Sequence, residues 1–134
     1  MKLNTLVALV CLAIALPACK KNTEKPPQHV PPERSVQYFV YTSQDYSNNN
    51  TYVTIKLRML AGNTPIWDSV LAPMQLKNIP GPSNKLIFEK KVPGNNPAEL
   101  STGFYYSIEN VGDSWYYELF KPGSESLKTV SLHL

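Results

Sequence analysis

Apolar and polar residues alternate along most of the chain after position 35, and this pattern constrains the fold more than any other feature of the sequence. Within Thr51–Leu60 every second residue is apolar, namely Val53, Ile55, Leu57 and Met59. Successive side chains of a β-strand point to opposite faces of the sheet, so this segment is expected to be a strand with one buried face. No segment of the domain carries the 3.6-residue period of a long amphipathic helix, which predicts an all-β fold.

Further segments of the same kind follow one another, separated by turns rich in Gly, Pro and Asn. We expect strands at Ser35–Thr42, Ile66–Leu71, Lys85–Val92, Phe104–Glu109, Ser114–Phe120 and Leu127–Leu134, with an edge piece at Met74–Ile79 between prolines. Seven or eight short strands in about 100 residues predict an immunoglobulin-like antiparallel sandwich. A small closed β-barrel is the alternative fold.

Two of these segments, Phe104–Glu109 and Ser114–Phe120, are expected to form a hairpin across a four-residue turn, Asn110–Asp113. This length puts the apolar residues of both strands on one face. Trp115 is then a core residue, and Trp67 is expected in the core as well. The expected cross-strand pairs are Glu109 with Ser114, Ile108 with Trp115, Tyr106 with Tyr117 and Phe104 with Leu119.

Three tyrosines are expected to point away from the core: Tyr52, Tyr105 and Tyr116. An exposed tyrosine offers an apolar ring and a hydroxyl, which suits stacking on a sugar or anchoring a protein partner. These tyrosines form the candidate binding patch, with a glycan or an envelope protein as its partner. The alternative is that tyrosine occupies these positions because it favours β-strands.

An apolar run, Leu6–Leu16, precedes the domain and follows the basic Lys2. Its 11 residues are about half of the roughly 20 that a membrane-spanning helix needs, so residues 1–18 are expected to be a secretory signal peptide. The run ends in Leu-Pro-Ala-Cys at residues 16–19, which resembles the lipobox of bacterial lipoproteins. The resemblance implies cleavage before Cys19 and attachment of a diacylglyceryl group and an acyl chain there. No other cofactor is expected.

Residues 19–34 hold the lipidated cysteine and a linker with four prolines and no hydrophobic period. In an extended polyproline conformation this tether reaches roughly 45 Å. The domain at 35–134 carries eight basic and eight acidic residues, so the formal charge of +3 comes from the signal peptide and the tether. A nucleic-acid binder needs a basic excess on its folded face, so we expect no nucleic-acid partner. The expected partner is the membrane, through the lipid anchor.

The sequence offers no residue set typical of catalysis or of metal binding, so we expect no enzyme activity and no metal site. After signal cleavage the chain has two histidines, His29 in the tether and His133 near the C-terminus, and neither is placed to serve a nucleophile. Three carboxylates near one turn, Glu109, Asp113 and Glu118, leave a carbohydrate-active enzyme as a third interpretation. Solvated charges near a turn are the simpler interpretation.

The lipobox, the tether and the strand spacing together resemble the small single-domain lipoproteins of Bacteroidota that carry an immunoglobulin-like domain. This resemblance implies architecture and an outer-membrane location. Surface-exported members carry an acidic run after the cysteine, whereas Lys20 and Lys21 follow it here, which favours a periplasm-facing position over the cell surface. The triplet Asp-Ser-Val at 68–70 resembles the O-glycosylation acceptor of exported proteins in this group, with Ser69 as the acceptor.

We therefore expect a membrane-anchored, non-catalytic lipoprotein of the cell envelope with a binding or structural role. The alternative is a periplasmic accessory or inhibitor subunit of a membrane complex, in which an exposed sheet edge pairs with a strand of the partner.

Overall fold

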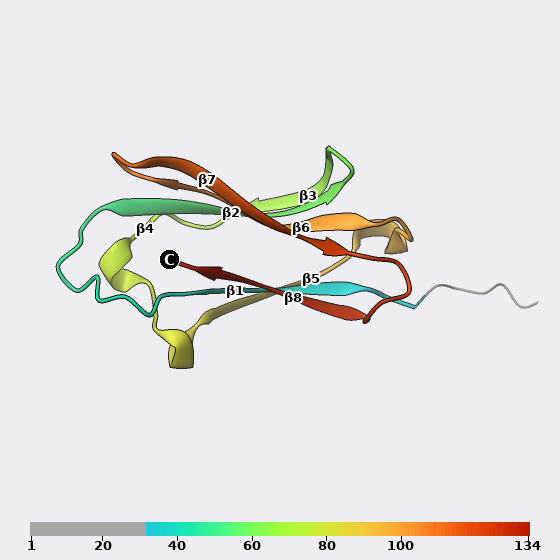
Figure 1. Ribbon diagram of the computed structural model, residues 1–134, viewed down its shortest axis with the longest axis horizontal. Helices are drawn as coiled ribbons and strands as arrows, with labels where there is room; N and C mark the ends of the chain where they lie inside the picture. The colour runs from blue at the N-terminus through green and yellow to red at the C-terminus, as the bar shows by residue number, and fades with distance from the viewer. Residues whose placement is uncertain (1–31) are drawn as a thin grey trace, which may run out of the picture.

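The computed structural model describes residues 32–134, in which eight strands form two sheets packed face to face (Figure 1). The expected signal peptide, Cys19, His29 and most of the tether lie outside the described residues. The strands are β1 (Ser35–Tyr41), β2 (Tyr52–Ala61), β3 (Thr64–Val70), β4 (Met74–Gln75), β5 (Leu86–Lys91), β6 (Leu100–Ile108), β7 (Gly112–Phe120) and β8 (Leu127–His133). Three short 3₁₀ helices lie in the connections: η1 (Leu76–Asn78), η2 (Pro82–Asn84) and η3 (Pro93–Asn95).

The predicted all-β sandwich is confirmed, and the chain does not close into a barrel. One sheet has the order β5-β1-β8, and the other has the order β3-β2-β6-β7 with β4 also paired to β2. Strands β1 and β8 run parallel, and the remaining pairs are antiparallel. The first two strands, β1 and β2, lie in different sheets. In immunoglobulin constant domains the first two strands share a sheet, so the strand order of this sandwich differs from theirs.

The core lies between the sheets and follows the predicted alternation of β1, β2 and β8. Its inward residues from these strands are Val36, Tyr38, Val40, Val53, Ile55, Leu57, Met59, Val130 and Leu132, all of them buried. Tyr38 is the one hydroxyl-bearing member, and its hydroxyl lies 2.9 Å from the carbonyl oxygen of Arg58 and 2.8 Å from Oγ1 of the buried Thr102. These bonds satisfy a polar group that burial would otherwise penalise. Burial raises the pKa of Tyr38 well above its ordinary value.

The register predicted for the β6–β7 hairpin is wrong by three residues. Ile108 pairs with Gly112, and Phe104 pairs with Tyr116. An odd shift exchanges the two faces of a strand, so Trp115 points to solvent and is 67% exposed. The prediction that Trp115 belongs to the core is therefore wrong. Trp67, in contrast, is partly buried against the core.

A tighter turn and a buried end residue explain this register. The N–H of Val111 donates to the carbonyl oxygen of Ile108 at 3.0 Å, and Asn110 within this turn has a φ of 61°. Asparagine tolerates this left-handed conformation better than most residues, which permits the shorter connection. At the other end of β7, Phe120 is buried, so alternation places the even-numbered residues of β7 inward.

Arg34 belongs to the folded domain, although the sequence places it in the tether. Its side chain is only 7% exposed, and its guanidinium lies 4.0 Å from the centre of the Phe120 ring. The guanidinium donates to the carbonyl oxygens of Asn96 at 3.1 Å, Ala98 at 2.8 Å and Phe120 at 2.6 Å. Arg34 therefore joins the point where the chain enters the sandwich to the β5–β6 connection and to the end of β7.

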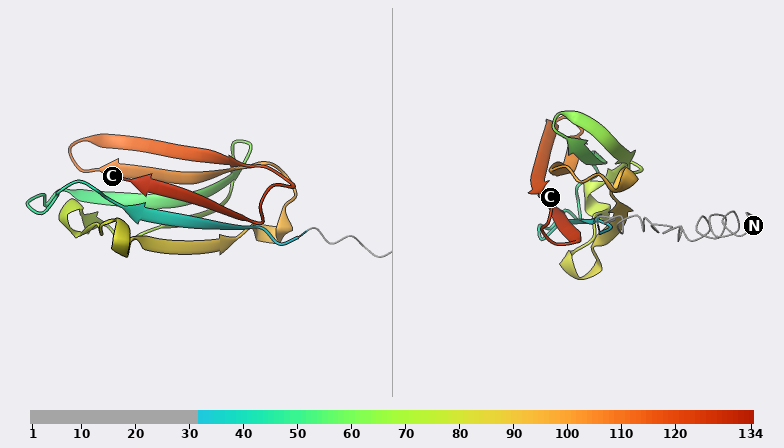
Figure 2. Two further views of the ribbon diagram at one scale, coloured as in Figure 1. Left: turned by 60° about the horizontal axis from the view of Figure 1, so that its bottom comes forward. Right: turned by 90° about the vertical axis from the view of Figure 1, so that its right-hand side faces the viewer.

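The chain enters at one end of the elongated sandwich, and a different set of loops lies at the other end (Figure 2). The β5–β6 and β7–β8 connections lie at the entry end. The loop at 42–51, η1, η2 and the C-terminus lie at the opposite end (Figure 1). Within residues 32–134, no helix is long and apolar enough to span a membrane.

Candidate functional site

The outer face of the five-stranded sheet gathers aromatic side chains between charged ones. Tyr105 and Trp115 are direct cross-strand neighbours on β6 and β7, and Lys56 of β2 lies in the same row. In the next row, Arg58 and Tyr117 lie on either side of Gly103. We call this surface the aromatic face, and its residues are Lys56, Arg58, Tyr105, Asp113, Trp115, Tyr117 and Leu119.

Gly103 allows the second row to pack closely. Gly103 itself is buried, and the hydroxyl of Tyr117 accepts a hydrogen bond from Nη1 of Arg58 at 3.4 Å, so the tyrosine side chain reaches across the glycine position. A Cβ atom on Gly103 would overlap the carbonyl oxygen of Tyr116 in the adjacent strand. A glycine within a strand often marks such a close approach of two backbones.

The first row carries an oriented carboxylate. The hydroxyl of Tyr105 donates to Oδ2 of Asp113 at 2.5 Å. This bond raises the pKa of Tyr105 and, with a further hydrogen bond from Ser107, lowers the pKa of Asp113. Asp113 is therefore ionised at neutral pH and its position is fixed beside the exposed indole of Trp115.

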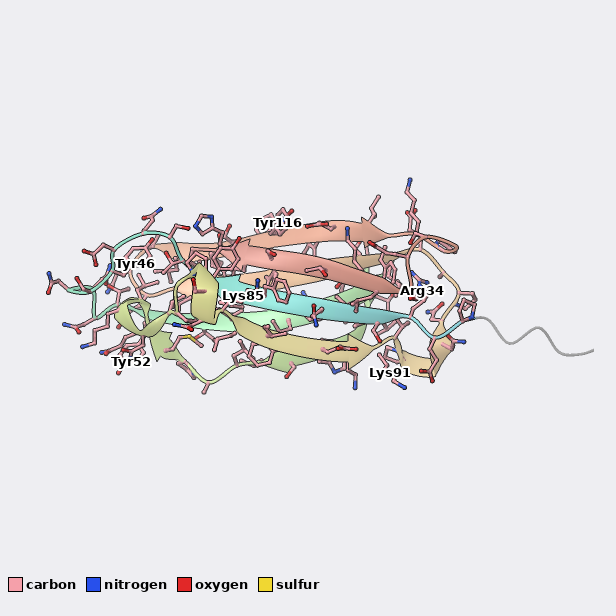
Figure 3. The ribbon with its side chains drawn as sticks, turned by 90° about the horizontal axis from the view of Figure 1, so that it is seen from below. Arg34, Tyr46, Tyr52, Lys85, Lys91 and Tyr116 are labelled. Carbon is pink, nitrogen blue, oxygen red and sulfur yellow. The ribbon has the colours of Figure 1, made fainter. Side chains whose placement is uncertain are left out.

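The structure separates the three tyrosines of the predicted binding patch. Tyr105 lies on the aromatic face, and Tyr52 lies on the same side of the sheet but at the far end of β2. Tyr116 pairs with Phe104 and points to the inner side, where its hydroxyl donates to Oε1 of Glu118 at 2.9 Å. Figure 3 shows Tyr52 and Tyr116 toward opposite edges of the sandwich. The three side chains therefore form no common patch.

The sequence prediction missed Trp115, Tyr117 and Leu119 as outward-facing residues because it used the wrong hairpin register. One signal could have corrected it: Phe120 ends the second strand of the hairpin, and its burial requires the odd-numbered residues of that strand to face outward. In the sequence, the three alternating apolar residues Trp115, Tyr117 and Leu119 outweighed the single Phe120.

The three carboxylates considered for catalysis point in different directions. Asp113 lies on the aromatic face, whereas Glu118 faces the inner side and lies 2.6 Å from Nζ of Lys128 on β8. Glu109 lies next to the turn and accepts the backbone N–H of Tyr52 at 3.3 Å. No two of them converge on a common cleft. In the part of the chain that the structure describes, no group of three or more His, Cys, Asp or Glu residues could hold a metal ion.

Ser69 and His133 both lie in positions where the fold itself accounts for their contacts. Ser69 of β3 lies opposite Leu57 of β2, is half-buried and faces the inner side of the sheet. A glycosyltransferase reaches such a position poorly in the folded chain. The imidazole Nε2 of His133 accepts the backbone N–H of Ser43 at 3.1 Å, and the ring stacks on Tyr41 with centroids 5.1 Å apart. This imidazole therefore fixes the loop that follows β1.

A hollow of about 410 Å³ lies at the end of the sandwich away from the chain entry, between the 42–47 loop, η1 and η2. Its one carboxylate, Asp45, already accepts the backbone N–H of Ser47 at 2.9 Å. The hollow is lined by loop residues of mixed polarity, and it lacks the convergent polar groups that typify ligand pockets. The aromatic face is the stronger candidate because its polar side chains are already oriented.

Comparison of the chain with protein-family models, with curated protein sequences and with solved structures finds no match.

Proposed function

We propose that this chain is a lipid-anchored, non-catalytic binding domain of the cell envelope that captures its ligand on the aromatic face. The observation that carries the proposal is the exposure of Trp115 beside Tyr105, Tyr117 and Arg58. Trp, Tyr and Arg are enriched among the few residues that contribute most to binding at protein interfaces. A clustered set of large exposed side chains generally marks such a surface in a soluble domain.

The membrane anchor in this proposal is the lipidated Cys19, in an outer membrane and facing the periplasm. Its support is the Leu-Pro-Ala-Cys sequence at 16–19 and the basic residues Lys20 and Lys21 after it. The chain enters the described domain at one end of the sandwich, and the aromatic face lies on one side of it (Figure 2).

The alternative role, an accessory or inhibitor subunit that pairs a sheet edge with its partner, meets an obstacle at one side of the sandwich. Strands β7 and β8 are edge strands of the two sheets on the same side of the sandwich. Glu118 of β7 and Lys128 of β8 form an ion pair between them. Both side chains are partly buried. Inward-facing charges at sheet edges oppose the addition of another strand. An accessory subunit would therefore not add its strand at this edge.

The anchor is tested by the intact mass of the membrane-extracted protein beside a Cys19→Ser variant. We expect the unaltered chain to carry the added mass of a diacylglyceryl group and an acyl chain, and the variant to lose it. An unmodified, freely soluble wild-type product would contradict the anchor.

The binding surface is tested by a photo-reactive amino acid at position 115, compared with the same group at position 87. Ile87 is an exposed residue on the outer face of the other sheet and serves as the matched control. We expect light-dependent adducts in intact cells from position 115 and none from position 87. Equal yields, or no adducts at either position, would contradict the proposal.

A further inference from the structure

We infer that the ligand of the aromatic face is a neutral glycan chain. This inference rests on the proposed function, in which this face binds a ligand, and it adds the chemical class of that ligand. Three properties of the surface support it: its shape, its hydrogen-bonding groups and its charge.

The shape suits an extended chain. Trp115 and Tyr117 are two residues apart on one face of β7, so strand geometry separates their Cα atoms by about 6.8 Å. Tyr105 lies directly across from Trp115. Aromatic rings at this spacing on an open sheet can each contact the apolar face of one sugar ring in a chain. The hollow between the 42–47 loop, η1 and η2 lies away from this face, which is the open side of a sheet, so an extended polymer suits it better than a small molecule that needs enclosure.

The polar groups suit hydroxyls. A sugar hydroxyl donates one hydrogen bond and accepts others, so a glycan site needs donors and acceptors side by side. The carboxylate of Asp113 accepts, and the guanidinium of Arg58 donates. The hydroxyl of Tyr105 donates to the carboxylate of Asp113, and the hydroxyl of Tyr117 accepts from the guanidinium of Arg58. Fixed groups lose little conformational entropy when a ligand binds.

The charge of the face favours a neutral ligand. Lys56 and Arg58 are balanced by Asp113 and by Asp68, which lies next to the aromatic face on β3, opposite Arg58 in the strand register. An anionic polymer finds no basic excess on such a surface. A protein partner is also disfavoured, because the centre of a protein interface is depleted of charged residues. Here Lys56, Arg58 and Asp113 lie directly beside the aromatic side chains.

The test is affinity electrophoresis of the full chain in detergent. The electrophoretic mobility of the chain is compared between gels with and without an embedded soluble glycan. The panel contains neutral glucan, mannan, xylan and galactan, with sulfated dextran as an anionic polymer. We expect at least one neutral glycan to retard the chain. Trp115→Ala should weaken this retardation by about tenfold or more, and Ile87→Ala should leave it unchanged.

A spectroscopic readout confirms the site. The chain has two tryptophans, so Trp67→Phe leaves Trp115 as the only indole. A bound neutral glycan should shift the emission of this exposed indole to shorter wavelength. If Trp67→Phe fails to fold, the same shift is measured in the unaltered chain and should be absent from Trp115→Ala.

The outcomes separate the inference from the proposed function. Retardation by sulfated dextran alone, or by no glycan on the panel, overturns the glycan assignment. If position 115 then still gives adducts with a protein in cells, the aromatic face remains a binding surface and its ligand is a protein. If no glycan retards the chain and position 115 gives no adducts in cells, the inference and the proposed function both fail.

Discussion

At the scale of single residues, Arg34 holds together the end of the domain where the chain enters. We expect Arg34→Met to lower the free energy of unfolding by about 3 kcal/mol, because it leaves three carbonyl oxygens without their charged donor. Urea denaturation measures this change. The control is Lys91→Met, which breaks the neighbouring exposed ion pair with Glu33 and should leave the midpoint unchanged. Equal midpoints for the two variants would show that Arg34 is not a structural clamp.

Gly103 is required by the close approach of β6 and β7. We expect Gly103→Ala to lower the free energy of unfolding by about 2–3 kcal/mol, since its methyl group would push against the backbone of Tyr116. Gly81→Ala is the matched control, because a Cβ atom there meets no atom within 4 Å and its φ of −71° suits alanine. Thermal unfolding distinguishes the two variants. A Gly103→Ala variant as stable as Gly81→Ala would contradict the observed packing.

Tyr38 makes stability depend on alkaline pH. Its pKa is raised by burial in the folded chain, whereas a tyrosine in the unfolded chain ionises near pH 10. Above about pH 10 the unfolded chain releases a proton that the folded chain keeps, so stability falls as pH rises, by up to about 1.4 kcal/mol per pH unit. Tyr38→Phe should remove this component of the slope. It should also cost about 1–2 kcal/mol at neutral pH, because buried Thr102 loses a hydrogen-bond partner. Chemical denaturation between pH 8 and 11 measures how the free energy of unfolding depends on pH. Identical slopes for the unaltered chain and Tyr38→Phe would contradict the role of buried Tyr38.

At the scale of secondary-structure elements, the β6–β7 turn determines which side chains reach the aromatic face. Asn110 has a φ of 61°, a conformation that costs alanine about 1 kcal/mol and glycine almost nothing. We expect Asn110→Ala to destabilise the domain by about this amount and Asn110→Gly to leave it unchanged, as measured by chemical denaturation. If alanine were tolerated as well as glycine, the turn would not depend on this left-handed residue.

The same hairpin shows where sequence reasoning succeeds and where it ends. The strands β1, β2 and β8 could be predicted with their inward residues, because each has a single consistent alternation. Strand β7 has two competing sets, with Trp115, Tyr117 and Leu119 on one face and Phe120 on the other. Propensity could not decide between them, since the deciding contact is tertiary: Arg34 packs on the ring of Phe120, 86 residues away in sequence.

Arg34 and Gly103 mark a second limit of the same kind. Arg34 follows four prolines and adjoins Glu33, so local composition assigns it to the tether. Gly103 stands among strand formers with no turn residue beside it. The role of each depends on a backbone segment that only the folded chain brings close, namely Ala98 for Arg34 and Tyr116 for Gly103. The three members of the aromatic face that were missed, Trp115, Tyr117 and Leu119, depend on the register of the β6–β7 hairpin.

At the scale of the whole molecule, the proposed tether enters at one end of a sandwich with balanced charge, and the proposed binding surface lies on one side of it. The domain needs no disulfide, because both cysteines of the chain, Cys11 and Cys19, precede residue 32. In the proposed mature form, in which residues 1–18 are removed and Cys19 is lipidated, a single cysteine introduced into the domain is the only free thiol.

This property allows a direct test of the proposal that the aromatic face is occupied by a ligand in the cell envelope. Leu119→Cys places a thiol on the aromatic face, and Ile87→Cys places one on the other sheet; the two native residues are equally exposed, at 54% each. The rates of maleimide labelling are compared in cells and in the purified protein. We predict that labelling at position 119 is slowed in cells and recovers to the rate at position 87 after purification. Equal rates at both positions in cells would contradict the claim.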